Sequence, residues 1–160
     1  MDIRQIDLVQ EVKEVVALQN PNEKKNRLER LSSIFEHGRE LNKVDLGKAV
    51  QILLDSVLQI DPDDKEMRES FFHAINSAVV FHDIGNRVNW EELVSLLPSL
   101  ENTLLEYALN LLGLSGQEKY LPVVEPYTHH ADPEVREWAE DAINEITYRV
   151  AHHPDTENGG

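Results

Sequence analysis

The sequence predicts an all-α chain built from repeating pairs of helices. Apolar residues recur at three- and four-residue spacing along most of the chain, which is the spacing of one helix face. Asp, Asn, Pro and Gly residues divide these periodic stretches into about eight segments. A triplet of Ala, Ile or Leu, and Asn begins at positions 74, 108 and 142, so the unit recurs every 34 residues. A fixed period of this length indicates a solenoid of stacked helix pairs.

Capping residues and glycines separate the predicted helices of the first half. Asn20 and Pro21 combine an N-cap with a first-turn proline, so a helix should begin there. Asp45 is expected to cap the third helix and Asp61 to open the fourth, with Gly85 as the C-cap of the fourth. The four helices predicted for this half are 3–19, 21–38, 46–60 and 62–82.

The second half contains a short helix that is capped by Asn89 and broken by Pro98, followed by a sixth helix that stops at 113–116. Asp132 is then a strong N-cap candidate, with Pro133 at the first helical position. The apolar face predicted for this last helix comprises Val135, Trp138, Ala139, Ala142, Ile143 and Ile146. We expect a single domain over 1–151, with repeats at about 3–38, 45–82, 89–114 and 117–150, and a disordered tail over 152–160.

The segment 116–146 resembles a HEAT repeat in its short bacterial form. The resemblance rests on Leu121-Pro122, Pro126, the run from Asp132 to Arg136, and the alanines that follow. It implies a right-handed α-solenoid of about four helix pairs, whose second helices line a concave binding surface. It also implies that Asp132 caps a second helix and that Arg136 reaches toward a neighbouring repeat. A 34-residue period also suits a tetratricopeptide array, but the Trp, Leu-Gly and Tyr signature of that family is missing.

Charge and composition restrict the classes of partner. The formal net charge is −15, yet residues 1–50 hold nine basic and nine acidic side chains, so the excess lies entirely after residue 50. Such a surface repels phosphate backbones and disfavours nucleic acid, including the role of a HEAT-like DNA-repair glycosylase. It would attract a basic protein, although solubility alone could also account for the charge. The absence of cysteine, of a signal peptide and of any long apolar run predicts a cytoplasmic protein away from membranes.

The predicted partner-binding face follows one edge of the second helices. On each of these helices the repeated Asn lies away from the most apolar stripe, and acidic and tyrosine side chains accompany it. Tyrosines among polar neighbours are typical of protein interfaces. An alternative is that the asparagines form an amide ladder between repeats. The predicted binding residues are Glu69, His73, Asn76, Glu106, Tyr107, Asn110, Glu137, Glu140, Asp141, Asn144 and Tyr148.

One short string resembles an enzyme motif. His82, Asp83, Ile84 and Gly85 resemble the core of the HD-domain phosphohydrolases, in which a His-Asp pair binds divalent metal. Asn86 stands where that family usually has lysine, and no upstream histidine has the expected spacing. The histidines at 129–130 and 152–153 are adjacent pairs, and adjacent residues seldom point at one ion. We therefore expect neither a metal site nor a cofactor.

The function predicted from sequence is a non-enzymatic protein-binding module, acting as an acidic HEAT-like adaptor or inhibitor. An immunity protein that neutralises a basic toxin domain is one form of this prediction, suggested by size, charge and fold. The alternative is a metal-dependent phosphohydrolase of the HD type, centred on His82 and Asp83.

Overall fold

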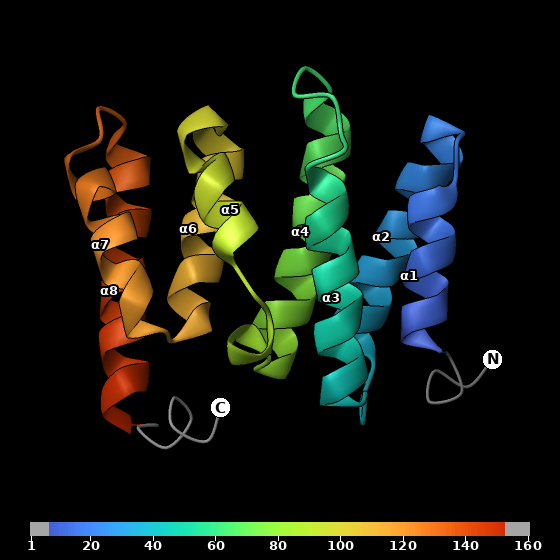
Figure 1. Ribbon diagram of the computed structural model, residues 1–160, viewed down its shortest axis with the longest axis horizontal. Helices are drawn as coiled ribbons and strands as arrows, with labels where there is room; N and C mark the ends of the chain where they lie inside the picture. The colour runs from blue at the N-terminus through green and yellow to red at the C-terminus, as the bar shows by residue number, and fades with distance from the viewer. Residues whose placement is uncertain (1–6, 153–160) are drawn as a thin grey trace. The chain divides into compact units, whose positions relative to one another are not determined.

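A computed structural model describes residues 7–152, which form eight α-helices joined by short connections, several of them 3-10 turns, and no strand (Figure 1). The all-α prediction is confirmed. None of these helices combines the length and the apolar character needed to cross a bilayer. The chain folds as two compact units, Met1–Ile84 and Gly85–Gly160, termed here the N-terminal and C-terminal units. The boundary falls between the second and third helix pairs predicted from sequence. Of the disordered tail predicted over 152–160, His152 belongs to the last helix, and residues 153–160 lie outside the described residues.

The four helices of the N-terminal unit each begin at a residue whose side chain caps the first turn. Asp7, Asn20, Asn42 and Asp64 each accept a hydrogen bond from the amide three residues later, at 3.0–3.1 Å. These bonds satisfy amides that have no partner within the helix. The helices are α1 (Leu8–Ala17), α2 (Pro21–His37), α3 (Lys43–Val57) and α4 (Lys65–His82).

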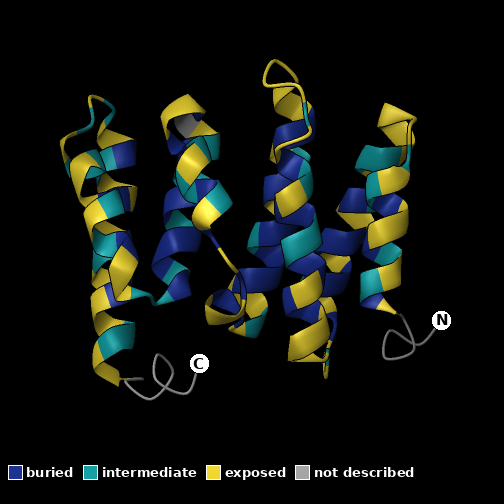
Figure 2. Cartoon of the chain, viewed as in Figure 1, coloured by how far each residue is buried: buried dark blue, intermediate teal, exposed yellow. Residues whose placement is uncertain are grey.

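In the N-terminal unit, helices that hold the same position in their pairs pack side by side. The first helices of the two pairs, α1 and α3, lie against each other, and the second helices, α2 and α4, do the same. The apolar side chains between them are fully buried, and Figure 2 shows α2, α3 and α4 with buried residues along part of each helix. The largest of these buried side chains are Leu28, Phe35, Leu53, Phe71, Phe72 and Ile75. Stacking of like helices buries the faces that a lone helix pair would expose.

Two of the predicted helix starts in this unit are wrong by three residues. Asn42, not Asp45, caps α3, and the Asp45 amide is the donor of that capping bond. Asp64, not Asp61, caps α4, because the Asp61 carboxylate instead accepts a bond from Asp63 N (2.9 Å) and forms a turn. Each prediction chose the wrong one of two capping residues that lie three residues apart. The predicted end of the third helix is also three residues too late, since α3 ends at Val57.

In the C-terminal unit the first helix of each pair is shorter than the second. Pro98 ends the first helix of one pair. Pro122 and Pro126 divide the first helix of the other pair into 3-10 and α pieces, since proline has no amide to donate. The first helix of the repeat predicted over 117–150 is therefore divided into short pieces. The elements are η2 (Gly85–Arg87), α5 (Glu91–Leu96), η3 (Leu97–Ser99), α6 (Asn102–Ser115), η4 (Glu118–Tyr120), α7 (Leu121–Val124), η5 (Glu125–His129) and α8 (Pro133–His152).

The helices α6 and α8 form the main contact of the C-terminal unit, while α7 and η5 also pack on α8. Their backbones approach closely at Gly113, where a Cβ atom would lie 2.9 Å from the Cα of Ala142. The second helices of this unit therefore pack directly on each other, as α2 and α4 do. Small residues at the contact permit this approach, which agrees with the alanine that recurs in the 34-residue pattern.

Glycines 85 and 116 have different roles from each other. Gly116 adopts a left-handed φ of 64° and ends α6, as predicted. Gly85 is not the C-cap of α4, because Asp83 takes the left-handed position with φ 46°. Instead, Gly85 lies against the end of α6, where a Cβ atom would be 2.1 Å from Leu114 O. Gly85 is needed for close packing rather than for helix termination.

Candidate functional site

The edge of α4 carries the part of the predicted face that belongs to the N-terminal unit. Glu69 and His73 are exposed there, and Asn76 is half-buried and makes an interaction within the protein. This edge contains one carboxylate and one imidazole. It is therefore much less acidic than the corresponding surface of the C-terminal unit.

The second helix of the last pair, α8, presents the strongest concentration of negative charge. All five of its predicted binding residues, Glu137, Glu140, Asp141, Asn144 and Tyr148, are exposed. Residues 85–160 contain four basic and fourteen acidic side chains, so this unit holds most of the negative excess of the chain.

One row of side chains along α8 combines acids with aromatic rings. Glu134, Trp138, Asp141, Glu145 and Tyr148 are spaced by four and three residues in turn, so they share one edge of the helix. We call this row the α8 stripe. Trp138 is 38% exposed and Tyr148 is 56% exposed, and the Tyr148 ring stacks on His152 at 4.0 Å between centroids. Exposed aromatic side chains among charges are typical of binding surfaces.

The α8 stripe meets α6 at a pair of carboxyl groups. Glu106 of α6 is half-buried and lies beside Glu134, with Asp132 close by. Burial raises the pKa of Glu106, and a hydrogen bond with Glu134 and the negative charges of Glu134 and Asp132 raise this pKa further. The two neighbours of Glu106 in the predicted face, Tyr107 and Asn110, are half-buried and make interactions within the protein. The negative charge at this junction is thus destabilising when no cation neutralises it.

Three members of the α8 stripe were not among the binding residues predicted from sequence: Glu134, Trp138 and Glu145. Trp138 was assigned to the apolar core of α8, but the core of this helix consists of Val135, Ala139, Ala142 and Ile146. Trp138 lies at the margin of that face, next to Glu134 on the α8 stripe. Its spacing from Asp141 and Tyr148 is the signal that could have identified it.

The start of α8 is fixed by side-chain bonds that hold Glu134 in place. The Asp132 carboxylate accepts a bond from Glu134 N at 2.9 Å, which confirms the predicted N-cap. Arg136 Nη1 donates to the carbonyls of His130 (2.8 Å) and Ala131 (3.1 Å). The resemblance to HEAT repeats implied that Arg136 would reach a neighbouring repeat; here it anchors the preceding loop of its own repeat. The first turn of α8 is therefore well defined beside α6.

The His82-Asp83 string has a structural explanation in the N-terminal unit. The His82 ring nitrogen Nε2 bonds the carbonyl of Phe35 at the end of α2, so it joins the ends of two packed helices. Asp83 ends α4 in the left-handed conformation. Within residues 7–152, no three His, Asp or Glu side chains are grouped so that they could hold a metal ion.

Comparisons of the chain with protein-family models, with curated proteins and with solved structures found no match. The likeness of 116–146 to a HEAT repeat therefore remains a resemblance of sequence pattern. What the chain does has to be inferred from its own surfaces, of which the junction of α6 with the α8 stripe is the most distinctive.

Replacing Glu106 with glutamine should raise the melting temperature at neutral pH. Because the folded-state pKa of Glu106 is above its ordinary value, the folded protein binds a proton more readily than the unfolded chain. This contribution to stability is complete below the ordinary pKa of glutamate and is lost as the pH rises through the raised value. Glutamine does not ionise and can still donate to Glu134. Thermal unfolding of both proteins from pH 3 to pH 8 measures the difference.

The expected difference in melting temperature is positive at pH 8 and close to zero near pH 3. Exposed Glu137 provides the control, because Glu137→Gln removes a carboxylate from the same unit without changing the junction at Glu106. A Glu106→Gln variant that is less stable than the parent at pH 8 would contradict repulsion at this junction.

Proposed function

We propose that this chain is a non-enzymatic protein-binding module that binds a basic protein segment on the α6 and α8 face of its C-terminal unit. The single observation that carries the proposal is the α8 stripe, in which two exposed aromatic rings lie among three carboxylates beside the raised-pKa Glu106. Glu145 already pairs with Arg149 at 2.8 Å, so lysine and arginine side chains of a partner can pair with Glu134 and Asp141 and stack on Trp138 and Tyr148. No other described surface combines these features.

We further propose that the helix pairs belong to a HEAT-like solenoid of four repeats. The packing within each unit supports this, because second helices lie against second helices: α2 on α4, and α6 on α8. The buried alanines Ala74, Ala108 and Ala142 occur at the same position of the 34-residue repeat, where close packing favours a small side chain. In such a solenoid the α8 stripe would be part of the binding surface of the second helices.

An inhibitor of a basic protein is the role that this surface suits best. Negative charge on the module speeds encounter with a positive partner, and the aromatic anchors then slow dissociation. An immunity protein that neutralises a basic toxin domain would use both effects. The same charge disfavours binding to nucleic acid, whose phosphates would be repelled.

Reversing the charge of the α8 face should weaken partner binding by about tenfold or more without unfolding the protein. The test variant combines Glu137→Lys with Asp141→Lys. The matched control combines Glu118→Lys with Glu125→Lys, since all four residues are exposed and each variant changes the net charge equally. The partner is captured from lysate with the parent protein as bait, and its dissociation constant is then measured for each variant by calorimetry.

A third variant, Trp138→Ala, separates the aromatic contribution from that of charge. We expect it to accelerate dissociation with little change in the association rate, whereas the charge variant should slow association. If the test and control variants weakened partner binding equally, the loss of affinity would come from the net charge of the protein and not from the α8 surface. Unchanged affinity in both α8 variants would remove this face as the binding site.

A further inference from the structure

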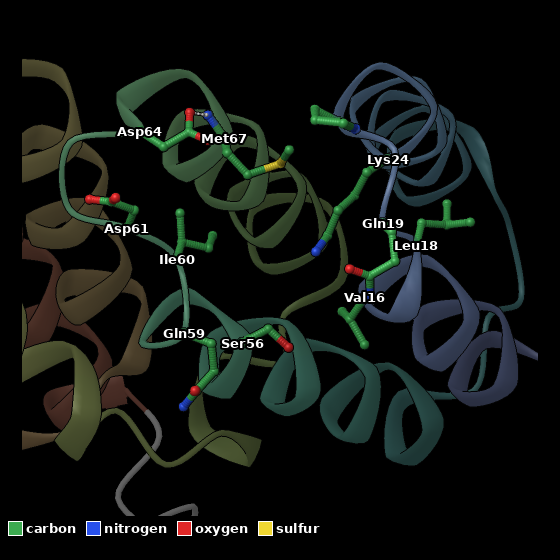
Figure 3. Close-up of a pocket in the computed structure, with 11 residues that line it drawn as sticks. Val16, Leu18, Gln19, Lys24, Ser56, Gln59, Ile60, Asp61, Asp64 and Met67 are labelled. Atoms are coloured by element: carbon green, nitrogen blue, oxygen red, sulfur yellow. Dashed lines mark hydrogen bonds between the residues drawn. The ribbon is translucent and has the colours of Figure 1, made fainter.

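The N-terminal unit contains a hollow of about 320 Å³ at one end of its helices (Figure 3). It lies between the α1–α2 connection, with the start of α2, and the α3–α4 connection, with the start of α4. A volume near the lower end of the range for ligand sites suits a small molecule rather than a folded partner. The hollow is far smaller than a protein interface, and none of its residues belongs to the proposed partner face.

The floor of the hollow is apolar. Val16, Ile60 and Met67 line it, and Figure 3 shows the side chains of Ile60 and Met67 directed toward the open space. Ser56 and Gln19 add oxygen acceptors: the Ser56 hydroxyl donates to Ile52 O at 2.8 Å, and the Gln19 amide nitrogen donates to Ala17 O at 3.2 Å. A ligand in this space would therefore need an apolar body that also offers a hydrogen-bond donor.

A lysine reaches the hollow from α2. Lys24 is half-buried, and its Nζ lies 5.5 Å from the centroid of the Phe71 ring (Figure 3). Within residues 7–152 it forms no salt bridge, although its neighbour Lys25 pairs with Glu66 at 2.8 Å. Lys24 also lies in the first turn of α2, where the helix dipole is itself positive. Both charges favour an anionic group on this side of the hollow.

The opposite side carries a carboxylate at its rim. Asp61 and Asp64 both line the hollow from the α3–α4 connection. Figure 3 shows the Asp61 carboxylate turned away from Lys24, into its own turn, where it accepts a hydrogen bond from Asp63 N. The Asp64 carboxylate accepts from Met67 N and keeps its place at the start of α4. The two sides thus differ in the sign of their charge, with apolar side chains between them. A simple anion would be repelled by Asp64, and a simple cation by Lys24.

We propose that this hollow binds a small zwitterion with an apolar body, of the amino-acid or dipeptide class. The carboxylate would bind Lys24, the ammonium group would bind Asp64, and the apolar side chains would cover Ile60 and Met67. The amide N–H of a dipeptide would supply the donor that Ser56 or Gln19 can accept. This site is independent of the partner-binding face on the C-terminal unit.

Three probes test the site in the full-length protein by NMR titration: leucyl-leucine, N-acetyl-leucyl-leucine and leucyl-leucine amide. The first carries both charges, the second only the carboxylate and the third only the ammonium group. We expect saturable shifts at residues of the hollow, with leucyl-leucine binding about tenfold more tightly than either of the others, because each lost charge removes a charged hydrogen bond.

Variants then assign each charge to its side. In Lys24→Met, leucyl-leucine should bind no better than leucyl-leucine amide does to the parent protein. In Asp64→Asn, which keeps the oxygen that accepts from Met67 N, it should bind no better than the N-acetyl compound does to the parent protein. Asp61→Asn is the control and should leave all three affinities unchanged, because the Asp61 carboxylate is turned away from the hollow. Equal affinity for the three probes, or no saturable shift with leucyl-leucine, would overturn the proposal.

Discussion

Replacing Trp90 with alanine should lower the free energy of unfolding by about 3–5 kcal/mol, the range for removing a buried aromatic side chain. Trp90 is fully buried at the start of α5, and its Nε1 donates to Gly85 O at 2.8 Å. The substitution therefore removes a large apolar contact and also leaves a carbonyl without this donor. Urea unfolding followed by far-UV circular dichroism measures the loss.

The other tryptophan of the chain is a matched control. Trp138 is 38% exposed on the α8 stripe, so Trp138→Ala should cost less than about 1 kcal/mol. Trp90→Phe keeps most of the packing and isolates the hydrogen bond, with an expected loss of about 1–3 kcal/mol. Similar losses from Trp90→Ala and Trp138→Ala would contradict the different burial of the two rings.

Gly113→Val should destabilise the C-terminal unit by about 1–3 kcal/mol, occasionally more, as overpacking of a tight contact does. A Cβ at this position would already lie 2.9 Å from Ala142 Cα and 3.1 Å from Ala142 Cβ. Both neighbouring atoms belong to the α8 backbone or directly adjoin it, so no flexible side chain can move aside. The helices α6 and α8 would have to separate, and urea unfolding again measures the cost.

Thr103→Val, on the same helix, is the control for a valine at an exposed position of α6. Thr103 is exposed, so this change should alter stability by no more than about 0.5 kcal/mol. A Gly113→Val variant as stable as Thr103→Val would show that α6 and α8 are not in close contact. The proposed stacking of second helices would then lose its main support in this unit.

The starts of two helices were predicted well. Asn20 with Pro21, and Asp132 with Pro133, begin helices as expected. Asp45 and Asp61 were wrong because Asn42 and Asp64, three residues away, compete for the same role. Local chemistry leaves these choices nearly equal, and the packing of α3 and α4 on their neighbours can then decide between them.

The candidate site was predicted in part. Periodicity correctly placed Glu137, Asp141 and Tyr148 on an exposed face of α8. It also assigned Trp138 to the core, because a helical spacing pattern cannot show where the apolar stripe ends. The pairing of Glu106 with Glu134 joins different helices and depends on how α6 packs on α8. No pattern within one helix could have indicated it.

The short pieces between Glu118 and His129 have a practical consequence. Prolines interrupt the backbone hydrogen bonds that a continuous helix would need in this segment. The start of α8 is defined separately, by the hydrogen bonds of Asp132 and Arg136. The geometry of the α8 stripe therefore does not depend on a continuous helix leading into it. A fluorescent reporter attached at exposed Pro122 or Glu125 would sit on a segment that packs on α8, and would therefore lie near the binding face without belonging to it.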